Sequence, residues 1–167
     1  MAWFRTALAG AVIGLMAAGP AAARDLRLEE FFKGRTSATG SFKAIDGTSR
    51  TFEVALHGGW DGKVLVLRED FRYADGETDT KTWRFEKTGW NTYSGTRDDV
   101  IGQTRVVLAG DRAYFNYLVD LDPGEGRNVV RFYDTLQLSA DGRSLTNTAI
   151  VFKGPLPVAR VRVDFER

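Results

Sequence analysis

Apolar and polar residues alternate strictly over residues 63–77, which predicts a long β-strand. Successive side chains of a strand point to opposite faces of its sheet, so the odd-numbered residues share one face. That face is apolar or aromatic apart from one carboxylate, since it carries Leu65, Leu67, Glu69, Phe71 and Tyr73. Glu69 is therefore predicted to point into an apolar interior, where a carboxylate needs either a partner or a function.

The same alternation recurs from Ala38 to the end of the chain, with turn signals about every ten residues. Several segments end in Asp-Gly, the strongest short signal for a β-hairpin. Strands are expected over residues 39–45, 50–58, 63–73, 80–87, 90–96, 103–109, 112–121, 128–138, 144–153 and 158–165. A closed barrel would hide both the apolar faces and the strand edges. We predict an all-β, antiparallel up-and-down barrel of about eight to ten strands, with a β-sandwich as the alternative.

One short helix is expected before these strands, over residues 25–33. Asp25 can cap its first turn and Gly34 can end it. Leu28, Phe31 and Phe32 recur at helical spacing and form an apolar patch. A short helix with such a patch must pack against the rest of the protein, and we expect it at the mouth or floor of a barrel.

The first 23 residues have the pattern of a secretory signal peptide. A single charge at Arg5 precedes an apolar run over residues 7–18, and Ala21 to Ala23 supply small residues before a cleavage site at Arg24. The run is shorter than the roughly 20 residues that span a bilayer. We expect residues 24–167 to form a single periplasmic or secreted domain; the alternative is an uncleaved membrane anchor.

The composition of the chain argues against several classes of function. The chain has 23 Lys and Arg against 22 Asp and Glu, with no concentrated basic patch, which argues against nucleic-acid binding. It has no cysteine, which excludes disulfides, thiol catalysis and thiolate metal sites. The sequence also lacks a nucleophile elbow, a phosphate-binding loop and a dinucleotide fingerprint, so we expect no cofactor.

Several motifs together resemble an uncharacterised, DUF3833-like family of bacterial envelope proteins, many of them lipoproteins. They are LEEFFKG (28–34), ATGSF (38–42), LREDFRYADGE (67–77), Trp83, YSGTRDDVIG (93–102), FYD (132–134) and TNTAIVFKG (146–154). The resemblance spans the mature chain and implies a lipocalin-like (calycin-type) barrel, but no known reaction. This sequence departs from the lipoprotein members because it lacks the cysteine that carries the lipid.

Two carboxylates, Glu69 and Asp134, fall on predicted apolar faces, and burying such groups is costly unless they are paired or hydrogen-bonded. One interpretation is that they line a pocket, with Trp83 beside Glu69 on the neighbouring strand. The other is a structural pair with an Arg or Lys, such as Arg84 or Lys81, or a position at the barrel rim, with the aromatic residues filling the core. The candidate ligand-binding residues are Glu69, Phe71, Tyr73, Trp83, Tyr93, Tyr117, Asp134 and Asn147.

Two further features have a functional and a structural interpretation. Asp98 and Asp99 could bind a hard cation, but their spacing is not that of an EF-hand loop and a tight turn explains them equally well. His57, the only histidine, is predicted to be solvated on the outer face. We assign no catalytic and no metal-binding residue.

Three functions remain open at this stage. The first is binding of a small apolar or amphipathic ligand, such as a lipid, inside the barrel. The second is a structural or interaction role in the envelope, through the outer face or the patch of Phe31 and Phe32. The third is a metal-independent isomerase or cyclase that uses an interior carboxylate as general acid or base.

Overall fold

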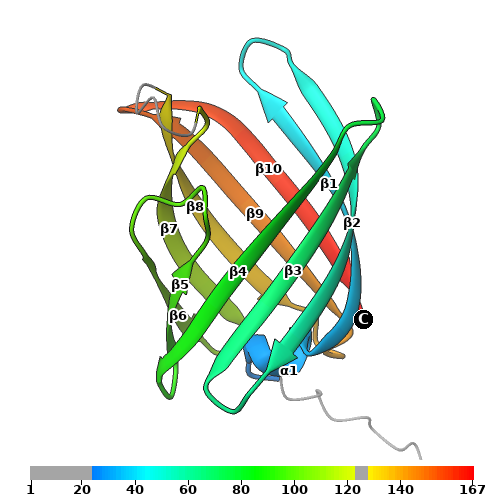
Figure 1. Ribbon diagram of the computed structural model, residues 1–167, viewed down its shortest axis with the longest axis vertical. Helices are drawn as coiled ribbons and strands as arrows, with labels where there is room; N and C mark the ends of the chain where they lie inside the picture. The colour runs from blue at the N-terminus through cyan, green and yellow to red at the C-terminus, as the bar shows by residue number, and fades with distance from the viewer. Residues whose placement is uncertain (1–23, 123–127) are drawn as a thin grey trace, which may run out of the picture.

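Ten antiparallel strands close into a barrel in the computed structural model of the protein, which describes residues 24–122 and 128–167 (Figure 1). Each strand pairs with its neighbours in sequence, and β1 pairs with β10 to complete the wall. The strands are β1 (Gly34–Ala44), β2 (Ser49–Trp60), β3 (Val64–Tyr73), β4 (Thr78–Gly89), β5 (Thr92–Thr96), β6 (Thr104–Ala109), β7 (Arg112–Asp120), β8 (Val129–Leu138), β9 (Ser144–Lys153) and β10 (Leu156–Glu166). The predicted all-β barrel is confirmed, and the sandwich alternative is excluded.

The predicted facing of the strands is also confirmed. In β3, Leu65 and Leu67 are buried while Val66 and Arg68 are exposed, so the odd-numbered face points inward. β1 starts about five residues earlier than the pattern predicts, because Thr36 and Ala38 already pair with β2 and point inward. Small and polar residues in this stretch conceal the alternation from a sequence-based interpretation.

The helix predicted over residues 25–33 is present as α1 (Leu28–Phe32), which is shorter than predicted and starts later. Asp25 does not cap it: the N-cap is Arg27, which makes no side-chain capping bond. Just before it the chain is fixed differently, because the amide of Leu26 donates to the carbonyl of Gly110 at 2.8 Å. The signal-peptide prediction concerns residues 1–23, which lie outside the described residues.

α1 closes one end of the barrel (Figure 1). Phe31 and Phe32 are buried, and the ring of Phe32 packs edge-on against Phe165 at 5.4 Å. Gly58 of β2 allows this close approach, since a Cβ at that position would lie 1.9 Å from the carbonyl oxygen of Phe32. The patch of Phe31 and Phe32 is therefore part of the core and presents no exposed surface to an envelope partner.

A buried polar contact fastens α1 to the wall. Glu29 is 9% exposed; its carboxylate accepts a hydrogen bond from the Tyr93 hydroxyl at 2.5 Å and forms a salt bridge with Lys87. Burial acts to raise the pKa of Glu29, but the bonds from Lys87 and Tyr93 outweigh it and lower that pKa. The helix is thus held by a charge-assisted contact as well as by its apolar face.

We expect Tyr93→Phe to lower the free energy of unfolding by about 2 kcal/mol, because a buried hydrogen bond to a charged group is worth roughly 1.5–3 kcal/mol. Urea denaturation measures the change. Tyr114→Phe, at an exposed tyrosine of β7, is the matched control and should be neutral. Equal stabilities of the two variants would show that the Glu29 contact contributes nothing.

The two shortest strands of the barrel are β5 and β6. The segment 97–103 between them lies along β7 instead of projecting into solvent: the amide of Ile101 donates to Leu118 at 2.9 Å, and Val100 forms a bridge with Val119. This segment therefore completes the wall between β5 and β7. Its first residue, Arg97, continues the inward-facing series of Tyr93 and Gly95.

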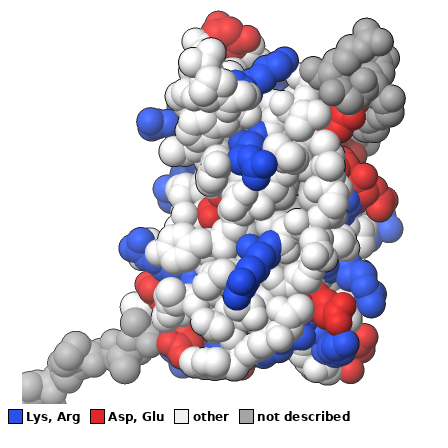
Figure 2. All heavy atoms as spheres, turned by 90° about the vertical axis from the view of Figure 1, so that its left-hand side faces the viewer, with Lys and Arg blue, Asp and Glu red and all other residues white. Residues whose placement is uncertain are grey.

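The outer surface carries charges of both signs, interspersed over the face shown in Figure 2. Within the described ranges, no helix has the length and apolar character needed to cross a membrane.

Candidate ligand-binding site

The barrel contains an apolar cavity of about 640 Å³. Its floor is made by Leu28 and Phe32 of α1, and its lining extends to Ile45 and Leu121, which are exposed at the opposite end. The cavity therefore reaches the surface at the end away from α1. Its size falls in the range of about 300–1,000 Å³ that is usual for small-molecule sites.

Aromatic side chains from β4, β7 and β8 form one continuous wall of the cavity. The Trp83 ring lies 5.1 Å from that of Tyr117, nearly perpendicular to it, and Tyr117 stacks on Phe132 at 5.4 Å. Phe85 and Phe115 extend this row, stacked against Trp83 and Tyr117 respectively. Rings that hold each other in this way offer a rigid apolar surface to a ligand.

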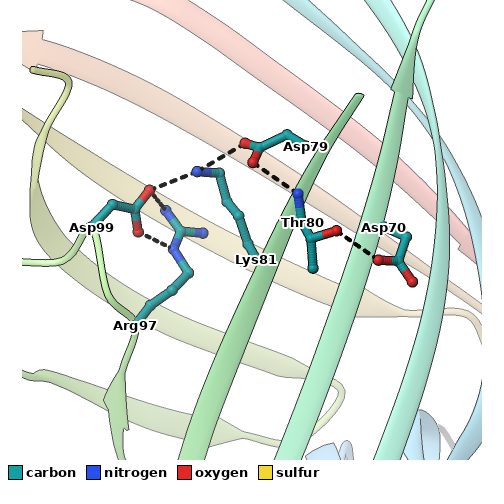
Figure 3. A network of polar contacts seen from close by, with 6 residues as sticks. All are labelled: Asp70, Asp79, Thr80, Lys81, Arg97 and Asp99. Atoms are coloured by element: carbon teal, nitrogen blue, oxygen red, sulfur yellow. Dashed lines mark hydrogen bonds and ion pairs between the residues drawn. The ribbon is translucent and has the colours of Figure 1, made fainter. Parts of the chain in front are cut away.

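A network of charged side chains lies against this wall (Figure 3). Arg97 donates to both carboxylate oxygens of Asp99, at 2.5 and 3.1 Å, and Lys81 of β4 donates to Asp99 at 2.9 Å. Lys81 also pairs with Asp79 at 3.1 Å. The Arg97 guanidinium lies over Trp83, 4.6 Å from the ring centroid, in a cation–π contact.

Glu69 of β3 points into the same cavity, directly opposite Lys81 in the strand register. Among the described residues, none forms a salt bridge or a hydrogen bond with its carboxyl; Lys81 turns to Asp99 and Asp79 instead. Burial raises the pKa of Glu69 to about 7, although the charges of Arg97 and Lys81 act against this shift.

A second carboxyl belongs to Asp134 of β8, which is 5% exposed. In the strand register, Asp134 lies opposite Ala149 of β9. Its Oδ1 accepts a hydrogen bond from Asn147 at 2.6 Å, while Asp134 Oδ2 and Asn147 Oδ1 have no hydrogen-bond partner in the described part of the chain. Burial raises the pKa of Asp134 to about 6, against the lowering effects of Asn147, the nearby Tyr117 hydroxyl and the charge of Arg97. Burial and the charge of Asp134 also raise the pKa of the adjoining Tyr117.

Most of the candidate ligand-binding residues line this cavity: Glu69, Phe71, Tyr73, Trp83, Tyr117, Asp134 and Asn147. Phe71 and Tyr73 lie toward its open end, where the Arg50 guanidinium covers the Tyr73 ring at 3.9 Å. Tyr93 does not line it. That side chain faces inward as predicted, but it lies beneath α1 with its hydroxyl on Glu29.

The structure also decides between the alternatives for the charged residues. Arg84 is exposed on the outer face, so it is not an interior partner for Glu69 or Asp134. Asp99 forms ion pairs with Arg97 and Lys81, and Asp98 is exposed. Across the described ranges, no group of acidic or histidine side chains is arranged to hold a metal ion. His57 is exposed, as predicted.

Arg97 is a charged cavity residue that the sequence analysis did not select. Its side chain is 11% exposed and is the cation nearest the aromatic wall. The available signal was the odd-numbered series of Tyr93, Gly95 and Arg97, which continues past the end of β5. The neighbouring aspartates and glycines indicate a loop, and a loop interpretation conceals this alternation.

Comparison with known proteins identifies the family. The profile of DUF3833, described as a protein of unknown function, matches residues 13–167. The chain belongs to the DUF3833 family. Among curated proteins, no significant relative of this DUF3833 protein was found.

Two solved structures resemble the DUF3833 barrel at low sequence identity. One is the S-type phycobiliprotein lyase CPES from Guillardia theta, with a TM-score of 0.56 and 9% identity over 84% of this chain and 90% of that chain. The other is Rv2717c from M. tuberculosis, with a TM-score of 0.59 and 13% identity over 81% of this chain and 92% of that chain. These similarities establish a lipocalin-like barrel for this DUF3833 member.

Proposed function

We propose that this protein binds a small apolar or amphipathic molecule, such as a lipid, inside its barrel. The observation that supports this proposal is the cavity itself: an aromatic enclosure of about 640 Å³ with a few convergent polar groups. That combination describes most small-molecule sites in proteins. A barrel that served only as a scaffold would gain stability by filling this space with side chains.

We further propose that it acts as an exported, periplasmic or secreted protein. This part of the proposal rests on the signal-peptide pattern of residues 1–23. A protein recovered from the periplasm with Arg24 as its first residue would support it. Recovery from the cytoplasm with residues 1–23 intact would contradict it.

Native mass spectrometry of the protein purified from its own cells tests the binding proposal, and a discrete additional mass that is lost on denaturation is the expected result. We expect Ala149→Phe to remove this mass or reduce it at least about tenfold, because the new ring would occupy the cavity beside Asp134. The neighbouring Thr148→Phe, on the outer face of β9, is the matched control and should retain it.

Titration with Nile red, an uncharged apolar dye, provides a second measurement for the same pair of variants. We expect wild type and Thr148→Phe to bind the dye with enhanced fluorescence and Ala149→Phe to bind it at least about tenfold more weakly, a difference of about 1.4 kcal/mol. Absence of both the additional mass and dye binding in a folded wild-type protein would refute the proposal.

One observation favours catalysis as a second candidate function. A pKa of about 7 suits Glu69 to donate or accept a proton near neutral pH. A metal-independent isomerase or cyclase acting on an apolar substrate would use such a group. Binding ranks first because the enclosed apolar surface is sufficient for it, whereas catalysis also requires a reacting group to lie beside Glu69.

A further inference from the structure

The two cations beside the aromatic wall are already paired with carboxylates, whereas Arg50, at the open end, bonds Asp75 and Glu77 through one terminal nitrogen and has a buried Nε with no partner among the described residues. Arg97 bonds Asp99 through its Nε and one terminal nitrogen, and a face of its guanidinium is covered by Trp83. Lys81 bonds Asp99 and Asp79. An anionic head group beside Arg97 and Lys81 would lie next to these carboxylates, whose negative charge would repel it.

Some hydrogen-bond acceptors of the cavity, in contrast, have no donor among the described residues. Asp134 Oδ2 and Asn147 Oδ1 are buried without a partner, and both residues line the cavity. Within the described chain, no salt bridge or hydrogen bond holds the carboxyl of Glu69, which lines it too. Buried acceptors without donors are rare in folded proteins because each loses its hydration without compensation.

We infer that the ligand carries a hydrogen-bond-donating head group, a hydroxyl or a protonated amine, which binds between Asp134 and Asn147 and points its apolar remainder along the aromatic wall. This inference rests on the proposed function, since it specifies the ligand of the same cavity. An ammonium group placed there can donate to both Asp134 Oδ2 and Asn147 Oδ1, whereas a hydroxyl can donate to one of them. A carboxylate at the same position offers no proton and adds a charge beside Glu69 and Asp134.

The test compares three ligands with the same alkyl chain, dodecanol, dodecylammonium and dodecanoate, each below the concentration at which it forms micelles. Each is titrated into the Nile red complex of the full-length protein near neutral pH, and displacement of the dye gives its affinity. We expect dodecanol and dodecylammonium to bind at least about tenfold more tightly than dodecanoate, since hydrogen bonds to a carboxylate are among the strongest in proteins.

Asp134→Asn separates the two kinds of donor. The amide keeps the shape of Asp134 and can still accept a bond from a hydroxyl, but it lacks the charge that an ammonium group requires. We expect the variant to lose at least about tenfold in affinity for dodecylammonium and much less for dodecanol. Asp70→Asn, on the outer face of β3, is the control variant and should change neither affinity.

Each outcome decides the inference. A preference of the wild type for dodecanol and dodecylammonium, with the selective loss in Asp134→Asn, supports it. Equal affinities of the wild type for the three ligands, a preference for dodecanoate, or an Asp134→Asn variant that loses no more affinity for dodecylammonium than for dodecanol would overturn the inference. Binding of Nile red would in each case leave the proposed function intact. A folded wild-type protein that binds no Nile red would overturn both.

Discussion

An Asp99→Ala variant is expected to lose about 3 kcal/mol of its free energy of unfolding, because removing one partner of a buried ion pair leaves the other charge uncompensated. Asp99 is the shared acceptor of Arg97 and Lys81, and the Arg97 side chain is only 11% exposed. Without the carboxylate, the guanidinium would remain beside Trp83 with no bonded acceptor. Urea denaturation of the purified variant measures the effect.

The control for this prediction is the adjacent residue. Asp98 is exposed, and Asp98→Ala should change stability by no more than about 0.5 kcal/mol. Arg97→Met combined with Asp99→Ala removes both charges, and this double variant should be more stable than Asp99→Ala alone. If Asp99→Ala and Asp98→Ala were equally stable, the buried pair would not contribute as the contacts indicate.

A Glu69→Gln variant is expected to gain stability over the wild type as the pH rises. The folded pKa of Glu69 is about 7 and lies above its unfolded value of 4.5. The stabilisation from the neutral carboxyl is therefore fully present below that unfolded value and is lost as the pH rises through about 7. Glutamine stays neutral and never has to place a charge in the cavity.

The free energy of unfolding of Glu69→Gln, relative to the wild type, is expected to grow from near zero at about pH 4.5 to about 2 kcal/mol at about pH 8. This value is smaller than the full pKa shift of Glu69 implies, because the side chain is partly exposed. The charges that face Glu69 are Arg97, Lys81, Asp99 and Asp134, and all remain in the variant. Denaturant unfolding at several pH values gives the comparison.

Glu53→Gln, at an exposed carboxylate on the outer face of β2, should follow the pH dependence of the wild type. Parallel profiles for the wild type and Glu69→Gln would mean that Glu69 titrates as an ordinary surface carboxylate. Such a result would remove the argument for an acid or base in the cavity, although the binding proposal would stand.

Alternation along each strand is sufficient to predict which face a residue occupies. Glu69 and Asp134 were placed correctly in the interior on this basis alone, and both line the cavity. Alternation does not indicate how far along the barrel axis a residue lies, because that depends on the stagger between strands. Tyr93 therefore shares the inner face but lies at the closed end, bonded to Glu29.

The contacts of the cavity depend on the packing of distant segments, and this is why Arg97 was missed. Its inward position follows from the way residues 97–103 lie along β7, which no local pattern specifies. The same limitation applies to the helix. Asp25 has a favourable side chain for capping, but the pairing of Leu26 with Gly110 holds the chain away from the first turn of α1.

The pairing of β1 with β10 joins the first and last strands of the barrel, so closure of the wall needs contacts between the most distant strands in the sequence. Ser37 pairs with Glu166, so the strand that begins the barrel must wait for the strand that ends it. Contacts between such distant residues form slowly because a large loop must be closed first. Until then, the edges of β1 and β9 remain available to other chains, and shielding them during synthesis becomes the main requirement for obtaining a monomeric barrel.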